Sequence, residues 1–189
     1  MIKDLAGIVR TWAAKKPDAP AIEFEGRSIT FGELDQRSSR LANALTGIGV
    51  KPQDRVAFID KNGPEFFDTV YALGKINAVC VAVNWRLAPA EMAYIIDHAG
   101  AEVVIVGPEF VPHIEKVLSD LPKVKTIIAI GGHTTWEDFE RFLQSGSSED
   151  PGVPSAPDDV CIQMYTSGTT GLPKGVMLTN DNFFRNLEG

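Results

Sequence analysis

The chain of 189 residues has few of the residues that build disulfide frameworks and metal sites, since it contains two cysteines and three histidines. Cys80 and Cys161 both lie in apolar runs, which predicts reduced thiols in the core rather than a bridge or a metal pair. The histidines, His98, His113 and His133, are isolated and lack the spacing of metal ligands, so we interpret each of them as structural.

An excess of basic charge and long apolar runs are also missing. The formal net charge is −7 and the Lys and Arg residues are scattered, which argues against a nucleic-acid-binding protein. No apolar run approaches the roughly 20 residues that span a bilayer, and the first residues lack the apolar core and cleavage site of a signal peptide. We therefore expect a cytoplasmic protein without a transmembrane segment.

The sequence does contain a regular alternation of apolar runs and helical patterns. Apolar runs predict strands at 55–60, 79–83, 103–107, 126–132 and 160–164, and two short strands flank the turn at Gly26. Helical spacing predicts helices at 3–15, at 30–47, from Pro64, from Pro89 and at 109–119. Thr30 and Glu33 form a capping box at the start of the second helix, and Gly100 suits a left-handed cap at the end of the fourth. This alternation predicts an α/β fold with a mostly parallel sheet flanked by helices.

One stretch, SGSSEDPGVPSAPDD at 145–159, is polar and rich in proline and glycine. We interpret it as a flexible linker into the next strand. Within it, Asp158 and Asp159 are adjacent and precede a strand, which favours solvated loop residues over an acid/base pair.

A phosphate-binding loop is predicted at 165–175, directly after the apolar run at 160–164. The loop would then lie at the carboxyl end of a strand, which is where open α/β sheets bind ligands. Its hydroxyl groups can donate to phosphate, its glycines allow close approach of backbone N–H groups, and its lysine supplies a positive charge. The candidate nucleotide-binding residues are Thr166, Ser167, Gly168, Thr169, Thr170, Gly171 and Lys174. The P-loop NTPase pattern is not met, because Pro173 precedes the lysine and Gly175 follows it.

The segment YTSGTTGLPKG resembles the phosphate-loop signature of the adenylate-forming, or AMP-binding, superfamily, and most resembles its acyl-CoA synthetases (fatty-acid–CoA ligases). ITFGELDQRSSRLANAL at 29–45 and ALGKINAVCVAVNWRL at 72–87 resemble further blocks of that family. The resemblance implies the N-terminal portion of the large domain of such an enzyme. It also implies ATP and a carboxylic acid as substrates, coenzyme A as cosubstrate, and Mg²⁺ as companion of the nucleotide.

The sequence departs from this family at several positions. Asn77, Ala82 and Trp85 stand where many acyl-CoA synthetases have Gly or Pro, and Asn180 stands where histidine is frequent. Trp85, with the arginine after it, could line a substrate or coenzyme channel, but a packing aromatic beside a surface ion pair is favoured.

The chain also ends at Gly189, whereas family members are more than twice as long. We therefore expect residues 1–189 to form a partial N-terminal domain without the C-terminal domain. It would lack a complete catalytic set, would be inactive alone, and would be inclined to self-associate through exposed apolar surface. Two alternatives stay open: a noncatalytic nucleotide-sensing or partner-binding module with the same fold, and an unrelated ATP hydrolase, which the context of Lys174 disfavours.

Overall fold

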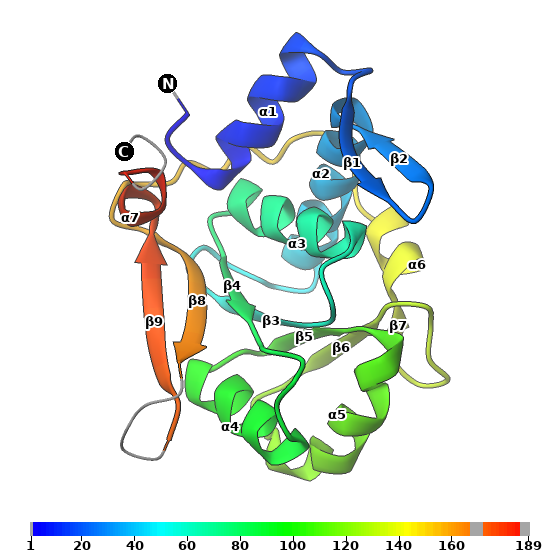
Figure 1. Cartoon of the computed structure of the whole chain (residues 1–189), viewed down its shortest axis with the longest axis vertical. Coiled ribbons are helices and arrows are strands. Elements are labelled where there is room, and N and C mark those ends of the chain that lie inside the picture. Colours follow the sequence, from blue (N-terminus) through cyan, green and yellow to red (C-terminus); the bar gives the residue numbers. More distant parts are fainter. Residues whose placement is uncertain (1, 167–171, 186–189) are drawn as a thin grey trace.

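A seven-stranded sheet forms the centre of the computed structural model, which describes residues 2–166 and 172–185. The strand order is β7-β6-β5-β3-β4-β8-β9, and every neighbouring pair is parallel except β8 and β9 (Figure 1). The strands are β3 Arg55–Ile59, β4 Val79–Ala82, β5 Val103–Val106, β6 Thr126–Ala129, β7 Glu137–Asp138, β8 Val160–Thr166 and β9 Lys174–Thr179. A separate antiparallel hairpin pairs β1 Pro20–Phe24 with β2 Arg27–Thr30.

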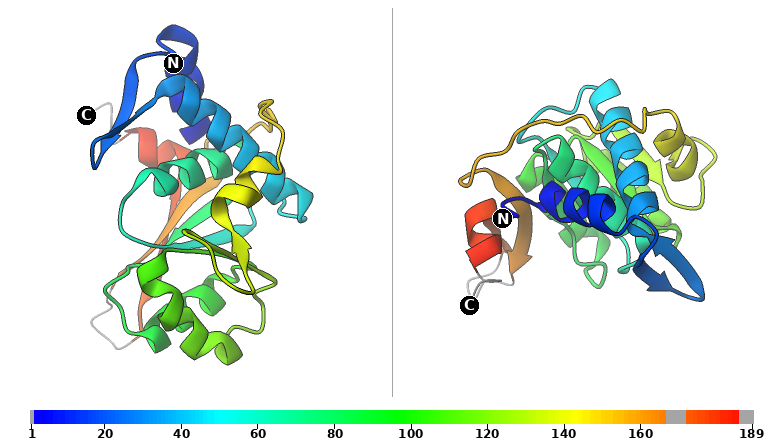
Figure 2. Two further views of the ribbon diagram at one scale, coloured as in Figure 1. Left: turned by 90° about the vertical axis from the view of Figure 1, so that its right-hand side faces the viewer. Right: turned by 90° about the horizontal axis from the view of Figure 1, so that it is seen from above.

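Helices cover both faces of the large sheet, which Figure 2 shows edge-on between two helical layers. The helices are α1 Leu5–Lys15, α2 Phe31–Gly47, α3 Pro64–Lys75, α4 Pro89–Ala99, α5 Val111–Val117, α6 Phe139–Gln144 and α7 Asn180–Arg185. Short 3₁₀ turns at Pro108–Phe110 and Leu118–Asp120 flank α5.

Alternation along each strand divides the buried side chains into two cores. Val56 and Phe58 of β3 pack with residues of α1, α2, α3 and α6 on one face. Ala57 and Ile59 pack with residues of α4 and α5 on the other face. Because the central strands are buried on both sides, they read as continuous apolar runs, which is why the sequence revealed them. The predicted α/β class with a mostly parallel sheet is confirmed.

The structure corrects the expected arrangement around the phosphate loop. Residues 165–175 were predicted as one loop, yet Thr166 is the last residue of β8 and Lys174 the first residue of β9. The short apolar run Val176–Leu178 forms an antiparallel edge strand, because it can pair with β8 directly across the connection. The short elements β7 and α6 were not predicted either.

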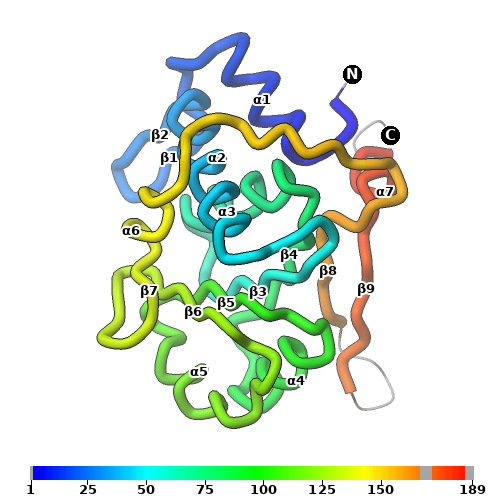
Figure 3. The backbone as a smooth tube through the Cα atoms, turned by 180° about the vertical axis from the view of Figure 1, so that it is seen from behind, coloured from blue at the N-terminus to red at the C-terminus, as the bar shows by residue number. Residues whose placement is uncertain are grey.

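The stretch at 145–159 has no helix or strand and runs past α2 to the start of β8 (Figure 3). It is held at several points: Arg10 makes two 2.7 Å hydrogen bonds to Asp150, and the side-chain amide of Asn43 donates to the carbonyls of Ser147 and Glu149. Its flexibility stays a prediction.

Candidate functional site

A cleft of about 240 Å³ opens at the carboxyl ends of β3, β4 and β8. The chain leaves β3 toward α3 on one face of the sheet and leaves β4 toward α4 on the other face. Open α/β sheets bind ligands at such a switch point, outside the carboxyl ends of the strands. The lining residues are Phe58, Asp60, Asn62, Phe66, Ala82, Val83, Asn84, Trp85, Met164 and Tyr165.

Asp60 is the acidic residue of this cleft. Burial raises the pKa of its carboxyl above the ordinary value, the N–H of Lys61 opposes that rise, and the charges of Glu65 and Glu109 add to it. A Cβ at Gly107 would lie 2.1 Å from the Asp60 carboxylate, so the glycine directly after β5 makes room for this side chain. Sequence reasoning did not identify Asp60, because its position depends on that neighbouring strand.

The aromatic wall of the cleft comes from the loop after β4. Trp85 packs beside Phe110, with ring centroids 6.0 Å apart, and the Arg86 guanidinium lies 4.0 Å from the Trp85 ring centroid. Trp85 thus makes the packing contacts that were expected, and it also lines the cleft. The expected surface ion pair is not seen, because no ion pair found within 2–166 and 172–185 includes Arg86.

Thr166 and Lys174 are the two predicted phosphate-binding residues that the structure describes. They are cross-strand partners at the ends of β8 and β9, next to the cleft residue Tyr165, and both are exposed. Both therefore border the connection between the strands. The remaining predicted residues, Ser167, Gly168, Thr169, Thr170 and Gly171, lie outside the described residues.

One histidine that the sequence presented as isolated touches this hairpin. Nδ1 of His98 lies 2.8 Å from the hydroxyl oxygen of Tyr165, the residue before Thr166. Of the other histidines, His133 contacts Glu115 at 3.2 Å, and Nδ1 of His113 is buried and has no hydrogen-bond partner among the residues that the structure describes. No three His, Cys, Asp or Glu side chains gather as a metal site in the described part of the chain, and both cysteines are buried free thiols.

The residues that depart from the family pattern have local structural roles. Asn77 has φ +55°, a left-handed conformation that suits glycine and that asparagine tolerates, and its amide donates to Asp159 at 2.9 Å. Asn180 is buried at the start of α7 and donates to the carbonyl of Ala156. Asp159 is thus engaged in the structure rather than freely solvated.

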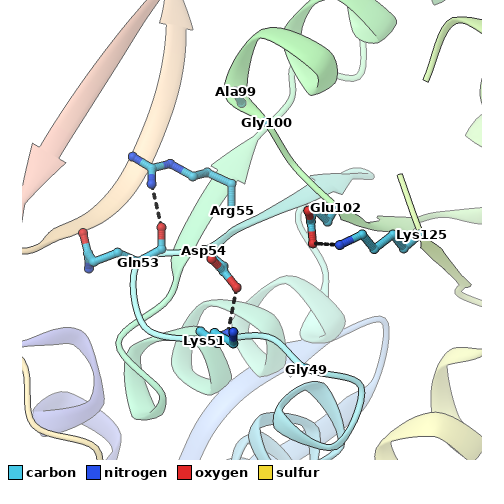
Figure 4. A pocket seen from close by; sticks show the side chains of 9 residues that line it. All are labelled: Gly49, Lys51, Gln53, Asp54, Arg55, Ala99, Gly100, Glu102 and Lys125. Atoms are coloured by element: carbon cyan, nitrogen blue, oxygen red, sulfur yellow. Dashed lines mark hydrogen bonds and ion pairs between the residues drawn. The ribbon is translucent and has the colours of Figure 1, made fainter. Parts of the chain in front are cut away.

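A second depression, of about 430 Å³, lies at the opposite edge of the sheet, near the amino ends of β3, β5 and β6. Figure 4 shows one ion pair there, between Lys125 and Glu102 at 2.7 Å, and two hydrogen bonds to the backbone. The carboxylate of Asp54 accepts from the backbone N–H of Lys51 at 2.8 Å, and the guanidinium of Arg55 donates to the backbone carbonyl of Gln53 at 2.6 Å. Because this depression lies away from the carboxyl ends of the strands, where open α/β sheets bind ligands, we do not assign it as the functional site.

Comparison with known proteins agrees with this geometry. The sequence profile described as "AMP-binding enzyme" matches residues 9–189. The chain belongs to this AMP-binding enzyme family. It is 38% identical over 173 residues to a fatty acid–[acyl-carrier-protein] ligase, ScoC, of Streptomyces coeruleorubidus, which covers 91% of the chain and 32% of the relative.

Solved structures of AMP-binding enzymes share the fold. The anthranilate CoA ligase AuaEII in complex with anthranoyl-AMP superposes with a TM-score of 0.93 at 26% identity, covering 98% of the chain and 36% of that protein. The N-terminal domain of FACL13 from Mycobacterium tuberculosis superposes with a TM-score of 0.86 at 31% identity, and the match covers 94% of the chain and 44% of that domain. The chain therefore corresponds to the N-terminal part of CoA ligases and spans about a third of the length of its curated relatives. No helix within the described ranges has both the length and the apolar character to cross a membrane.

Proposed function

We propose that this chain supplies the triphosphate-binding part of an ATP-dependent carboxylate–CoA ligase. The observation that carries the proposal is the pair formed by Thr166 and Lys174, which borders the connection 167–173 beside the cleft at the switch point. A hydroxyl and an ammonium at the two ends of a connection rich in Ser, Thr and Gly suit the phosphates of ATP. The proposed nucleotide-binding set is Thr166, Ser167, Gly168, Thr169, Thr170, Gly171 and Lys174.

The proposed reaction has two steps. A carboxylate oxygen attacks the α-phosphorus of ATP and pyrophosphate leaves, giving an acyl-adenylate; the thiol of coenzyme A then attacks the acyl carbon, and AMP leaves. Lys174 contributes to the first step, since its positive charge stabilises the negative charge that builds on pyrophosphate. Mg²⁺ is expected to arrive with the nucleotide, but the described residues offer no set of metal ligands, so we assign it no step.

The acid and the thiol acceptor differ among the relatives. ScoC is named for a fatty acid and an acyl-carrier protein, and AuaEII for anthranilate and coenzyme A. For this chain we propose a carboxylic acid substrate, coenzyme A as acceptor and a cytoplasmic location, where ATP and coenzyme A are available.

Mapping the contacts of three ligands by amide chemical shifts tests the binding proposal. MgATP and inorganic tripolyphosphate should both shift the amides of Thr166 and of Lys174 to Thr179, whereas adenosine should not, because the described site offers groups for phosphate. Equal shifts from adenosine, or shifts confined to the depression near Lys51, would contradict the assignment. Carboxylate-dependent exchange between ATP and pyrophosphate should be absent for the chain alone; measurable exchange would overturn the proposal that it is inactive.

One observation favours a second candidate, a noncatalytic module that associates with a partner or with itself. Several large apolar side chains of the β8–β9 hairpin are exposed: Met164 at 42%, Leu172 at 64%, Val176 at 40% and Met177 at 55%. An edge strand with such side chains is open to pairing with another chain. Sedimentation velocity should show concentration-dependent association that Val176→Lys weakens; a monomer at every concentration would count against this candidate.

A further inference from the structure

Tyr165 has two side-chain partners immediately before the proposed phosphate-binding segment. The side-chain amide of Gln163 donates to its hydroxyl oxygen at 3.1 Å, and Nδ1 of His98 lies 2.8 Å from the same oxygen. Since the amide nitrogen can only donate, the hydroxyl hydrogen of Tyr165 is not used by Gln163 and is available to Nδ1 of His98.

The ring of Tyr165 also lies against the neighbouring strand. Tyr165 and Gly175 are cross-strand partners. A Cβ at Gly175 would lie 3.2 Å from Cζ of Tyr165 and 3.1 Å from Nε2 of Gln163. Because Gly175 has no side chain, the ring of Tyr165 can pack across the backbone of β9 at this position. Aromatic side chains commonly cover a glycine on the neighbouring strand in this way.

The third residue of this group, His98, belongs to α4, a helix with several side chains buried in the core. Met92, Ile95 and Ile96 on the same helix, α4, are at most 1% exposed. One turn before His98, the ring of Tyr94 stacks on it, with centroids 5.4 Å apart and planes 28° apart. Figure 1 shows the lower ends of β8 and β9 beside α4, and the contact between His98 and Tyr165 joins the hairpin to this helix.

We propose that Tyr165, Gln163 and His98 form a clamp that holds Thr166 and Lys174 in register. The pair Thr166–Lys174 is the next one outward from Tyr165–Gly175 and the last pair of the strand register, so the clamp lies one residue pair from the end of the two paired strands. Without the clamp, the ends of β8 and β9 sample more conformations. A smaller fraction of the molecules then has the Thr166 hydroxyl and the Lys174 ammonium placed to bind the same ligand. The apparent affinity for that ligand falls by the same fraction. The clamp residues are positioning residues, and their effect on nucleotide binding rests on the proposed function.

The first test measures the clamp without any ligand. Hydrogen–deuterium exchange of the amides at 174–176 should be about two- to tenfold faster in Tyr165→Phe and in His98→Ala than in the wild type, the factor expected for one net hydrogen bond. Tyr71→Phe is the matched control, since it removes the same atom from a tyrosine on α3 and should leave this exchange unchanged. Exchange unaltered by both clamp variants would overturn the proposal.

The second test separates positioning from general stabilisation. Tyr165→Phe should weaken MgATP binding about two- to tenfold, and this loss should shrink in the Lys174→Ala background, because the clamp acts through the placement of Lys174. An equal loss in both backgrounds would overturn the positioning role.

The two tests also distinguish the clamp from the proposed function. If exchange accelerates but the wild-type chain binds no MgATP, the proposed function fails and the clamp stands. If MgATP binds but exchange is unaltered, the clamp fails and the function stands.

Discussion

Replacing Lys75 by methionine removes a fully buried ammonium while keeping a side chain of similar length. In the structure, Nζ of Lys75 donates to the carbonyl of Asp35 at 2.8 Å, to its carboxylate at 2.6 Å and to the hydroxyl of Ser39 at 2.6 Å. A carboxylate oxygen of Asp150 lies 3.5 Å away. One cation thus joins α3, α2 and the segment at 145–159.

The size of the effect follows from the exposure of these partners. Removing one member of a buried ion pair costs about 3–5 kcal/mol. The side chains of Asp35 and Asp150 are 29% and 31% exposed, so water can solvate them after the replacement. The hydroxyl of Ser39 keeps its own hydrogen bond to the carbonyl of Asp35. We therefore expect a loss of about 2–3 kcal/mol, which lowers Tm by about 4–12 °C in a chain of this length.

Urea unfolding followed by circular dichroism measures this loss directly. Lys75→Met should lower the midpoint without changing the slope, because the native and unfolded surfaces stay similar. Lys116→Met, on the exposed surface of α5, is the matched control and should stay within about 0.5 kcal/mol of the wild type. A midpoint for Lys75→Met equal to that of the control would refute the reasoning that the buried cation holds these elements together.

Three further predictions concern stability. Asn77→Ala should lose about 1–2 kcal/mol and Asn77→Gly less, because alanine is strained at φ +55° and glycine is not; thermal unfolding that ranks alanine above glycine would contradict this. Gly146→Ala should strongly lower the urea midpoint, because the added Cβ would lie 2.0 Å from the backbone carbonyl oxygen of Arg40 in α2. The control Gly47→Ala adds a Cβ with nothing within 4 Å and should be tolerated. Equal urea midpoints for the two variants would disprove the packing argument. Burial raises the pKa of Asp68 to about 6, against the opposing guanidinium of Arg37, so the folded chain keeps a proton that the unfolded chain has lost. Stability should therefore fall as the pH rises from about 4 to about 6, and Asp68→Asn should flatten that fall in the pH dependence of the urea midpoint; an unchanged slope would count against it.

Local features of the fold were predictable because neighbouring residues decide them. Thr30 and Glu33 form the expected capping box, with reciprocal hydrogen bonds of 3.2 and 2.8 Å, and Gly100 ends α4 with φ +72°. These signals lie within one or two turns of helix, so the sequence alone displays them.

Features that depend on distant segments were not predictable in the same way. The contact between His98 and Tyr165 joins residues 67 positions apart, so His98 looked isolated in the sequence. Burial of Lys75 requires partners from α2 and from the segment at 145–159, and no periodicity marks it. The edge strand β9 was not predicted, because its apolar run is short and follows glycine and proline, which ordinarily indicate a loop.

The central claim is that this chain binds the phosphates of ATP through Lys174. A calorimetric titration with MgATP, performed on the wild type, on Lys174→Ala and on Lys116→Ala as a surface control, tests it most directly. We predict binding to the wild type and the control, and about ten- to hundredfold weaker binding to Lys174→Ala, the loss expected for a charge-assisted bond to phosphate. Equal affinity of Lys174→Ala and the wild type, or no binding to the wild type, would contradict the account.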